Sequence, residues 1–260
     1  MSENNTTNAL FNVTMPDSVD NALQNLTDKP TQSIGQTISD IWYIVFGGIS
    51  NYAEKKKIKY AHSLEQFQQE LASSVSNIPP EKQLEPSLQT TAQALENSKY
   101  CLEEKELRDM FTSLISNSMN VDFSKDVHPS FAEIIKQMSP LDAEIIKIFK
   151  NSPTNGFPLC RYEITENVGY RILLENVFLR HSQTDLSTVS LSISSLVRLG
   201  LLKTTYEDYL LGKDLYSAFT KHPWFNMLQQ NFPDKTVSIQ KGIVLLTPLG
   251  RSFTRVCIPD

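Results

Sequence analysis

Two prolines and a regular apolar spacing limit residues 128–145 to two short helices joined at Ser139-Pro140. A fourth helix of the chain is predicted to begin at Pro129 and to turn Phe131, Ile134, Ile135 and Met138 inward. Ser139 is a typical N-cap, and Pro140 suits a first helical position. Asp142 and Glu144 then fall in the first turn, where the helix dipole favours negative charge.

Three further helices are predicted upstream. A long helix over 33–76 is indicated by apolar residues at three- and four-residue steps, with a kink or a close helix contact expected at Gly47-Gly48 because two glycines weaken a helix. The others cover 85–99, with Pro86 at its first position, and 103–120, where Glu104 and Arg108 are spaced to pair.

From residue 139 onward the pattern mixes helices with extended segments. The elements expected after the helix at Pro140 are an extended piece over 157–164, a helix around Leu173–Phe178, a helix over 185–202 ended by Gly200, a strand over 201–206, a helix over 216–230, one or two strands over 235–247 with a turn at Lys241-Gly242, and a last helix opened by Thr247-Pro248. This order resembles a winged helix-turn-helix with a helix inserted between its two strands.

The fold class expected is therefore mainly α, with an N-terminal helical region followed by a winged-helix-like α+β region. Three parts are predicted: a disordered lead over 1–32 with a short helix near 18–26, a helical region over 33–138, and a winged-helix-like domain over 139–260. Residues 1–138 hold 11 Lys and Arg against 18 Asp and Glu, whereas residues 139–260 hold 13 against 11. No chain-wide positive field favours nucleic acid.

Motifs for catalysis or cofactor binding are absent from the sequence. The three cysteines are far apart, and none of the four histidines lies at metal-ligand spacing from another ligand. No glycine-rich phosphate-binding motif occurs, and the acids near His128 and Asp142 have no nucleophile beside them. We therefore expect no cofactor, no metal and no enzymatic activity. Without a secretory signal at the N-terminus, a cytoplasmic protein is expected.

The first candidate site combines an apolar helix with a lysine cluster. Residues 41–46 read Ile-Trp-Tyr-Ile-Val-Phe, and four lysines follow closely. Aromatic residues beside lysines are typical of helices that lie at a membrane interface. The residues proposed to bind a membrane or a partner are Trp42, Phe46, Lys55, Lys56, Lys57 and Lys59. The alternative is a helix that faces the core and has a solvated basic end.

The second candidate site belongs to the helix predicted over 185–199. A DNA-reading helix needs Arg, Lys, Asn or Gln at its exposed positions, and this one offers mainly serines. The cations available for nucleic acid are Arg198, Lys203, Lys235 and Lys241. A winged helix that packs or binds protein is favoured over one that binds DNA.

Residues 104–120 (Glu-Lys-Glu-Leu-Arg-Asp-Met-Phe-Thr-Ser-Leu-Ile-Ser-Asn-Ser-Met-Asn) and 128–146 together resemble the Abi-alpha family, a bacterial family named for abortive infection. The resemblance covers about residues 40–258, and it is strongest at His128–Phe131 and Ser139–Ala143. It implies a cytoplasmic antiviral defence protein and no catalytic residue.

The function expected is non-enzymatic defence through contacts with a protein partner, including another copy of the chain, or with the inner face of the membrane. The alternative is a DNA-binding transcriptional regulator that uses the C-terminal winged helix.

Overall fold

A computed structural model describes residues 32–46, 54–150, 152, 156–166, 168–182, 185–212 and 214–259, with only the backbone described at 32–36 and 54–58. The lead predicted over 1–32, with its short helix, and the Gly47-Gly48 kink lie almost entirely outside these residues. Two compact units are present, one of residues 1–136 with 259–260 and one of residues 137–258. They are called unit 1 and unit 2 below.

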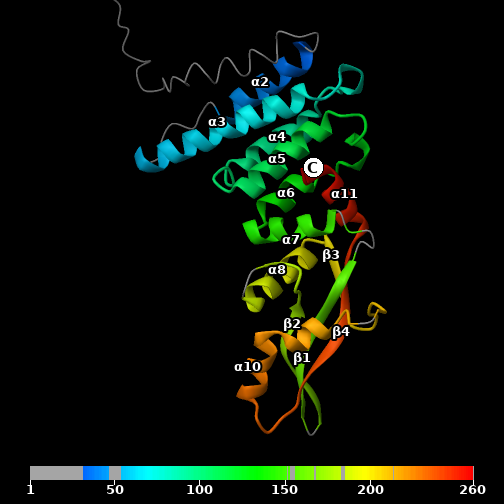
Figure 1. Cartoon of the computed structure of the whole chain (residues 1–260). Coiled ribbons are helices and arrows are strands. Elements are labelled where there is room, and N and C mark those ends of the chain that lie inside the picture. The colour runs from blue at the N-terminus through cyan, green and yellow to red at the C-terminus, as the bar shows by residue number, and fades with distance from the viewer. Residues whose placement is uncertain are drawn as a thin grey trace, which may run out of the picture. The chain divides into compact units, whose positions relative to one another are not determined.

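Unit 1 is helical (Figure 1). Its elements are α2 (Gln32–Phe46), α3 (Glu54–Ser76), the 3-10 turn η1 (Pro80–Lys82), α4 (Leu88–Ser98), α5 (Lys105–Ser118), the 3-10 turn η2 (Ser124–Asp126) and α6 (Phe131–Lys136). The long apolar segment thus forms two helices, α2 and α3. Helix α5 lies at the centre and packs against α3, α4 and α6, because Met110, Phe111, Leu114 and Ile115 are fully buried on it.

Two local predictions in unit 1 were wrong. The first position of α4 is Leu88 rather than Pro86, because the Ser87 hydroxyl caps the helix and accepts a hydrogen bond from the Thr90 amide. Arg108 pairs with Glu70 of α3 rather than with Glu104 one turn away, at 3.0 Å from Nε to Oε2. Its Nη1 also donates to the Leu102 carbonyl. A tertiary partner therefore replaced the neighbour on the same helix.

Unit 2 combines helices with a four-stranded antiparallel sheet in the order β2-β1-β4-β3. Its elements are α7 (Pro140–Lys150), β1 (Gly156–Glu166), β2 (Gly169–Val177), α8 (Leu186–Arg198), β3 (Leu202–Thr205), α9 (Ser217–Lys221), α10 (Pro223–Asn231), β4 (Val237–Leu246) and α11 (Pro248–Cys257). The cap expected at Ser139 and the helix start expected at Thr247-Pro248 are confirmed, since the hydroxyls of Ser139 and Thr247 each accept a hydrogen bond from the amide three residues on. Gly200 ends α8 with a φ of 76°.

The helix predicted around Leu173–Phe178 is instead strand β2. Its apolar residues fit either period, and pairing with β1 decides for the strand, with Tyr162 opposite Leu174 and Glu163 opposite Ile172. Consequently a strand, not a helix, precedes α8. The mainly α composition with an α+β C-terminal part is present, whereas strand β2 takes the place of the helix expected before α8.

The turn predicted at Lys241-Gly242 was also wrong, because β4 runs straight through it. Gly242 lies opposite Leu159 of β1. A Cβ there would be 2.5 Å from the Thr205 carbonyl oxygen and 2.8 Å from the Tyr206 ring. The glycine therefore permits a close approach of β3 to β4 rather than a reversal of the chain.

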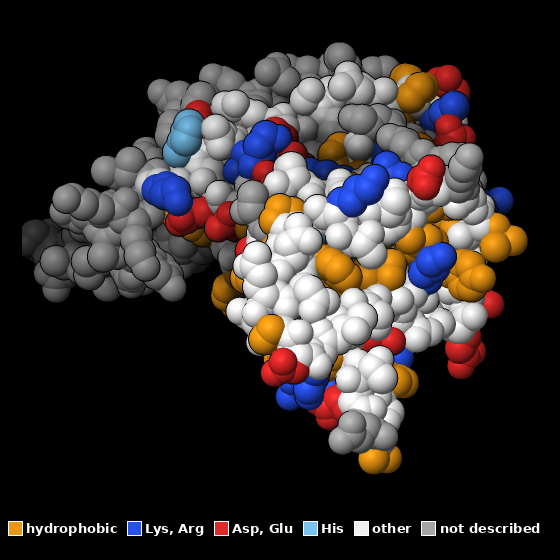
Figure 2. All heavy atoms as spheres, turned by 60° about the horizontal axis from the view of Figure 1, so that its bottom comes forward, with side chains coloured by type: hydrophobic (Ala, Val, Ile, Leu, Met, Phe, Trp, Pro, Cys, Tyr) orange, Lys and Arg blue, Asp and Glu red, His pale blue; other side chains and the backbone are white. Residues whose placement is uncertain are grey.

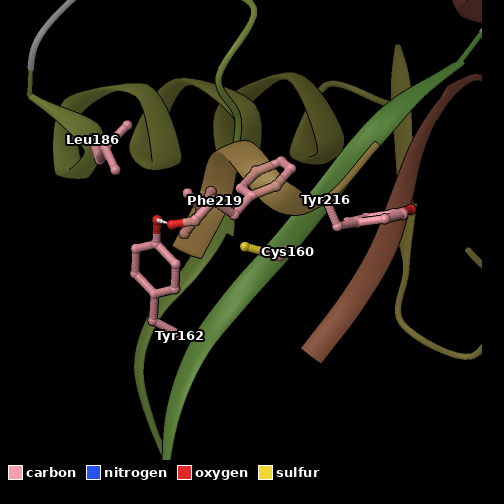
Figure 3. Close-up of a cluster of buried hydrophobic side chains, with 6 residues drawn as sticks. Cys160, Tyr162, Leu186, Tyr216 and Phe219 are labelled. Carbon is pink, nitrogen blue, oxygen red and sulfur yellow. Dashed lines mark hydrogen bonds between the residues drawn. The ribbon is translucent and has the colours of Figure 1, made fainter. Parts of the chain in front are cut away.

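One face of the sheet is covered by a hydrophobic cluster (Figure 3). Its buried members are Cys160, Tyr162, Val177, Leu186, Tyr216 and Phe219. The hydroxyl of Tyr162 donates a hydrogen bond to the Phe219 carbonyl at 2.9 Å, as the dashed line shows. The hydroxyl of Tyr216 donates a hydrogen bond to the Gly242 carbonyl at 2.7 Å. These two bonds tie the segment that contains α9 to the sheet.

Candidate functional site

Helix α2 presents apolar residues on two sides. Trp42 and Phe46 are buried in unit 1, at 2% and 3% exposure, and the Trp42 ring lies 4.5 Å from Phe46 and 5.6 Å from Phe67 of α3. Tyr43 and Ile44 point outward and are 75% and 78% exposed. In this arrangement the apolar surface open to a partner is therefore formed by Tyr43 and Ile44.

The lysine cluster is described only in part. Lys55, Lys56 and Lys57 lie on α3, where only the backbone is described. The Lys59 ammonium lies 2.6 Å from the Glu103 carboxylate, and this hydrogen bond raises the pKa of Lys59. Lys59 is therefore held toward the start of α5. None of the helices in the described ranges is both long enough and apolar enough to cross a bilayer.

A second constellation lies on the sheet face opposite the hydrophobic cluster. The Arg161 guanidinium of β1 stands over two tyrosine rings, 5.0 Å from the centre of Tyr170 and 4.9 Å from that of Tyr206. It also donates to the Tyr170 hydroxyl at 3.0 Å and to Glu163 at 3.3 Å. Cation–π contacts with two rings fix the guanidinium, and Glu163 compensates its charge.

Tyr206 links this cluster to helix α8. Its hydroxyl donates to the Asn176 side chain at 3.1 Å and accepts from the Asn176 amide at 2.9 Å. The Asn176 side chain in turn donates to Ser194 of α8 at 3.0 Å. Burial raises the pKa of Tyr206 to about 12. Asn176 has a φ of 50°, which is uncommon outside glycine and which this network sustains.

This arginine–tyrosine cluster was not predicted from the sequence, because its members come from β1, β2 and the residue after β3. Neither periodicity nor a short motif connects residues so far apart. The alternation of polar and apolar residues along 159–164 was the available signal, because it places Arg161 and Glu163 on one face of a strand.

The four cations considered for nucleic acid do not come together. Arg198 at the end of α8 is exposed and donates to Gln137 at 3.0 Å, and Lys203 is exposed on β3. Lys235 pairs with Glu166 at 2.8 Å. Lys241 lies over the rings of Tyr209 and Tyr216, 5.5 and 5.4 Å from their centres. Three of the four, Arg198, Lys235 and Lys241, are thus already engaged within the protein.

The three thiols of the chain lie in apolar surroundings. All three cysteines are buried, and burial raises the pKa of each thiol, to about 11 for Cys101. A hollow of the surface is lined by six residues, none of them histidine or cysteine: Thr165, Glu166, Val168, Asp234, Lys235 and Thr236. Within the described residues, no group of three or more His, Cys, Asp or Glu side chains is placed to hold a metal ion.

A family model described as abortive infection alpha matches residues 59–257 of the chain. No curated protein and no solved structure matches the chain. The matched segment includes α5 to α11 in full and leaves out α2, so the helix with the exposed Tyr43 and Ile44 lies before the region that the family model describes.

Proposed function

Because this chain belongs to the Abi-alpha family, abortive infection alpha, we propose that it is a non-enzymatic protein of bacterial antiviral defence. Abortive infection arrests an infected cell before phage are released. The proposed mode of action is contact with the inner face of the membrane or with a protein partner. Helix α2, together with the lysines that follow it, makes this contact.

The observation that carries the proposal is the exposure of Tyr43 and Ile44 on a helix whose other side is buried. Large apolar side chains that stay exposed beside a buried side are suited to a further contact, so Tyr43 and Ile44 are the candidate surface of α2. Four lysines lie within 15 residues of Ile44 in the sequence, at positions 55, 56, 57 and 59. Near an anionic leaflet, a lysine contributes about 1 kcal/mol of attraction, and the ion pair with Glu103 offsets the contribution of Lys59.

The non-enzymatic part of the proposal is supported by the surroundings of the reactive side chains. The thiols have raised pKa values, and Asp142 is engaged in helix capping. A catalytic acid, base or nucleophile would instead be expected in a cleft with a partner beside it.

The test is a phage challenge of bacteria that express the full chain, combined with sedimentation of the purified protein with vesicles. The double substitution Tyr43→Ser and Ile44→Ser should abolish both protection and sedimentation with anionic vesicles. Leu88→Ser, at a residue of α4 with 64% exposure, is the matched control and should change neither. If the wild type protects cells but does not sediment with vesicles, the contact of α2 is with a protein partner. If the wild type gives no protection against phage, the proposal of a defence function is wrong.

A DNA-binding regulator is the second candidate, favoured by the strand order β1-β4-β3 and by α8, which directly precedes β3. Arg198 and Lys203 are exposed on this part of unit 2 and could contact phosphate groups. Electrophoretic mobility shifts at two salt concentrations test it, since binding through phosphate contacts weakens steeply with salt. Replacing Arg198 and Lys203 by Gln should then remove the shift.

A further inference from the structure

One turn of four residues occurs in both units with the same geometry. Two of the four histidines are followed by Pro-x-Phe, in the segments His128–Phe131 and His222–Phe225 at the starts of α6 and α10. In each segment the histidine Nδ1 accepts a hydrogen bond at 3.2 Å from the amide two residues on, that of Ser130 or Trp224. The histidine carbonyl accepts another at 3.0 Å from the phenylalanine amide. The segments are called the His128 turn and the His222 turn below.

The hydrogen bond to Nδ1 requires a neutral imidazole. A ring nitrogen that accepts carries no proton, so the proton of the ring lies on Nε2. A protonated imidazole has N–H groups at both nitrogens, and its Nδ1–H would then be directed at an amide N–H. The added positive charge would also lie at the positive end of the helix dipole. Protonation therefore replaces a stabilising helix cap by an unfavourable contact.

The residue after the proline decides how each turn tolerates a proton. In the His128 turn, the Ser130 hydroxyl lies 2.7 Å from the same Nδ1. A hydroxyl both donates and accepts, so it can rotate to accept a hydrogen bond from a protonated ring. Trp224 holds the corresponding place in the His222 turn, and an indole is a donor without an acceptor. Of the two turns, the His222 turn is thus the one that a proton disrupts.

The surroundings of His222 favour its neutral form. Burial lowers the pKa of His222 from its ordinary value of 6.5. In Figure 2, which turns the lower end of Figure 1 forward, histidine side chains occupy little of the visible surface. The folded chain therefore binds the proton of this residue less readily than the unfolded chain does.

The charged and titratable groups on the elements beside α10 do not change charge in the range where a histidine titrates. Helix α10 packs against α9, β4 and the hydrophobic cluster. Their ionisable side chains near α10 are Lys221 of α9, Arg171 of β2, Lys235 and Lys241 at and in β4, and Cys160, Tyr162 and Tyr216 of the cluster. None of these groups titrates between about pH 5 and 8, because burial raises the pKa values of the thiol and the phenols further.

The His222 turn holds the part of α10 that covers the hydrophobic cluster. Trp224 and Phe225 pack against the cluster, and the rings of Phe225 and Tyr162 meet edge to face at 5.5 Å. The backbone amides of the same two residues are the donors to His222. A turn that loses its hydrogen bond to the imidazole therefore loosens the residues that shield the cluster.

We propose that the His222 turn is a pH switch, in which protonation of His222 releases the start of α10 and uncovers the hydrophobic cluster of unit 2. The contribution of the turn to the stability of α10 is fully present above about pH 6.5 and is lost as the pH falls through the lower pKa of the folded chain. The proposal concerns α10 alone and does not depend on the defence function or on the contact proposed for α2.

The test is hydrogen exchange of the full chain at about pH 7.5 and about pH 5, corrected for the intrinsic exchange rates. Amides of α10 should open about fivefold more often at the lower pH, the effect expected from the loss of one helix cap, whereas those of α6 should not respond. In His222→Asn the α10 amides should be equally protected at both pH values, because asparagine caps helices without titrating. His181→Asn is the matched control and should leave the response of α10 intact.

A second variant tests the reason for the difference between the turns. Ser130→Ala removes the alternative acceptor, so α6 should become sensitive to acid as α10 is. If α6 of this variant does not respond, the hydroxyl does not distinguish the turns and the proposal is wrong.

Two further outcomes overturn the proposal. One is a wild-type α10 that is equally protected at both pH values, and the other is a response of α10 that persists in His222→Asn. Nitrogen chemical shifts of the His222 ring at about pH 7.5 give an independent check. They should show the proton on Nε2, and a proton on Nδ1 would exclude the hydrogen bond on which the switch depends.

Discussion

The carboxylate of Asp142, in the first turn of α7, accepts a hydrogen bond from the hydroxyl of Ser192 in the middle of α8. It also accepts from the Ser195 hydroxyl at 3.2 Å and from the Ser139 amide at 2.9 Å, while the Asp142 amide donates to the Ser139 hydroxyl at 3.1 Å. Asp142 is 3% exposed. One side chain thus caps α7 and fixes α8 against it.

Replacing Asp142 by Ala should destabilise the protein by about 3 kcal/mol, because it removes the helix cap and leaves the buried Ser192 hydroxyl without its acceptor. Chemical denaturation measures this. Glu144→Ala is the control in the same turn. The Glu144 carboxylate is 45% exposed and pairs with His181, so this substitution should lower the free energy of unfolding by less than about 1 kcal/mol. Equal costs for the two substitutions would contradict a structural role of Asp142.

The start of α7 could be predicted from the sequence because its signals are local. Ser139, Pro140 and the acidic first turn are contiguous, and the apolar steps that follow fit only a helix. The serines that hold Asp142 lie some 50 residues further on, and no periodicity links them to it. Likewise the residues of β2 fit helix and strand equally well, and only pairing with β1 distinguishes the two.

The ion pair of Arg108 and Glu70 should show a coupling of about 1–2 kcal/mol in a double-mutant cycle, because the Arg108 side chain is only 6% exposed. Arg108→Met keeps the apolar stem and removes the charge. Glu70→Gln is the partner substitution, and the free energy of unfolding is the quantity compared.

The same cycle with Glu104→Gln in place of Glu70→Gln is the control. Glu104 is the partner that helical spacing alone predicts, and its coupling to Arg108 should be close to zero. A coupling larger than that of Glu70 would mean that the contact between neighbouring turns, rather than the tertiary one, stabilises α5.

The candidate site could be predicted only in outline. Residues 41–46 are apolar almost without interruption, which marks α2 as unusual but leaves open which side faces inward. Packing against Phe67 buries Trp42 and leaves Tyr43 and Ile44 outside. For the arginine–tyrosine cluster, the sheet register brings Arg161 near Tyr170 and Tyr206, and register depends on the whole sheet.

Gly242→Ala should destabilise unit 2 by about 2–3 kcal/mol, since the added methyl group would overlap the Thr205 carbonyl and the Tyr206 ring. The unfolding midpoint in urea measures the loss. Gly212→Ala is a suitable comparison: its Cβ would meet only the end of the Leu215 side chain at 2.7 Å, which can move aside. If both variants are as stable as the wild type, there is room for a methyl group between Gly242 and Thr205, and the glycine is not required there.

Stability should fall as the pH rises above about 10, and Tyr206 should contribute to that fall. Burial raises the pKa of Tyr206 to about 12, whereas an unfolded tyrosine titrates near its ordinary value of 10. Between these two values the unfolded chain releases the proton and the folded one keeps it, so each step upward in pH favours unfolding. Below pH 10 both states are protonated, and the contribution is fully present.

The measurement is the urea midpoint of unfolding at several pH values between 8 and 12, for the wild type and for Tyr206→Phe. The variant lacks the ionisable hydroxyl, so its midpoint should start lower, through loss of the hydrogen bonds to Asn176, but decline less steeply above pH 10. Parallel curves for the two proteins would show that Tyr206 titrates alike in the folded and unfolded chain. Cys101, with a pKa raised to about 11, adds a decline that both proteins share.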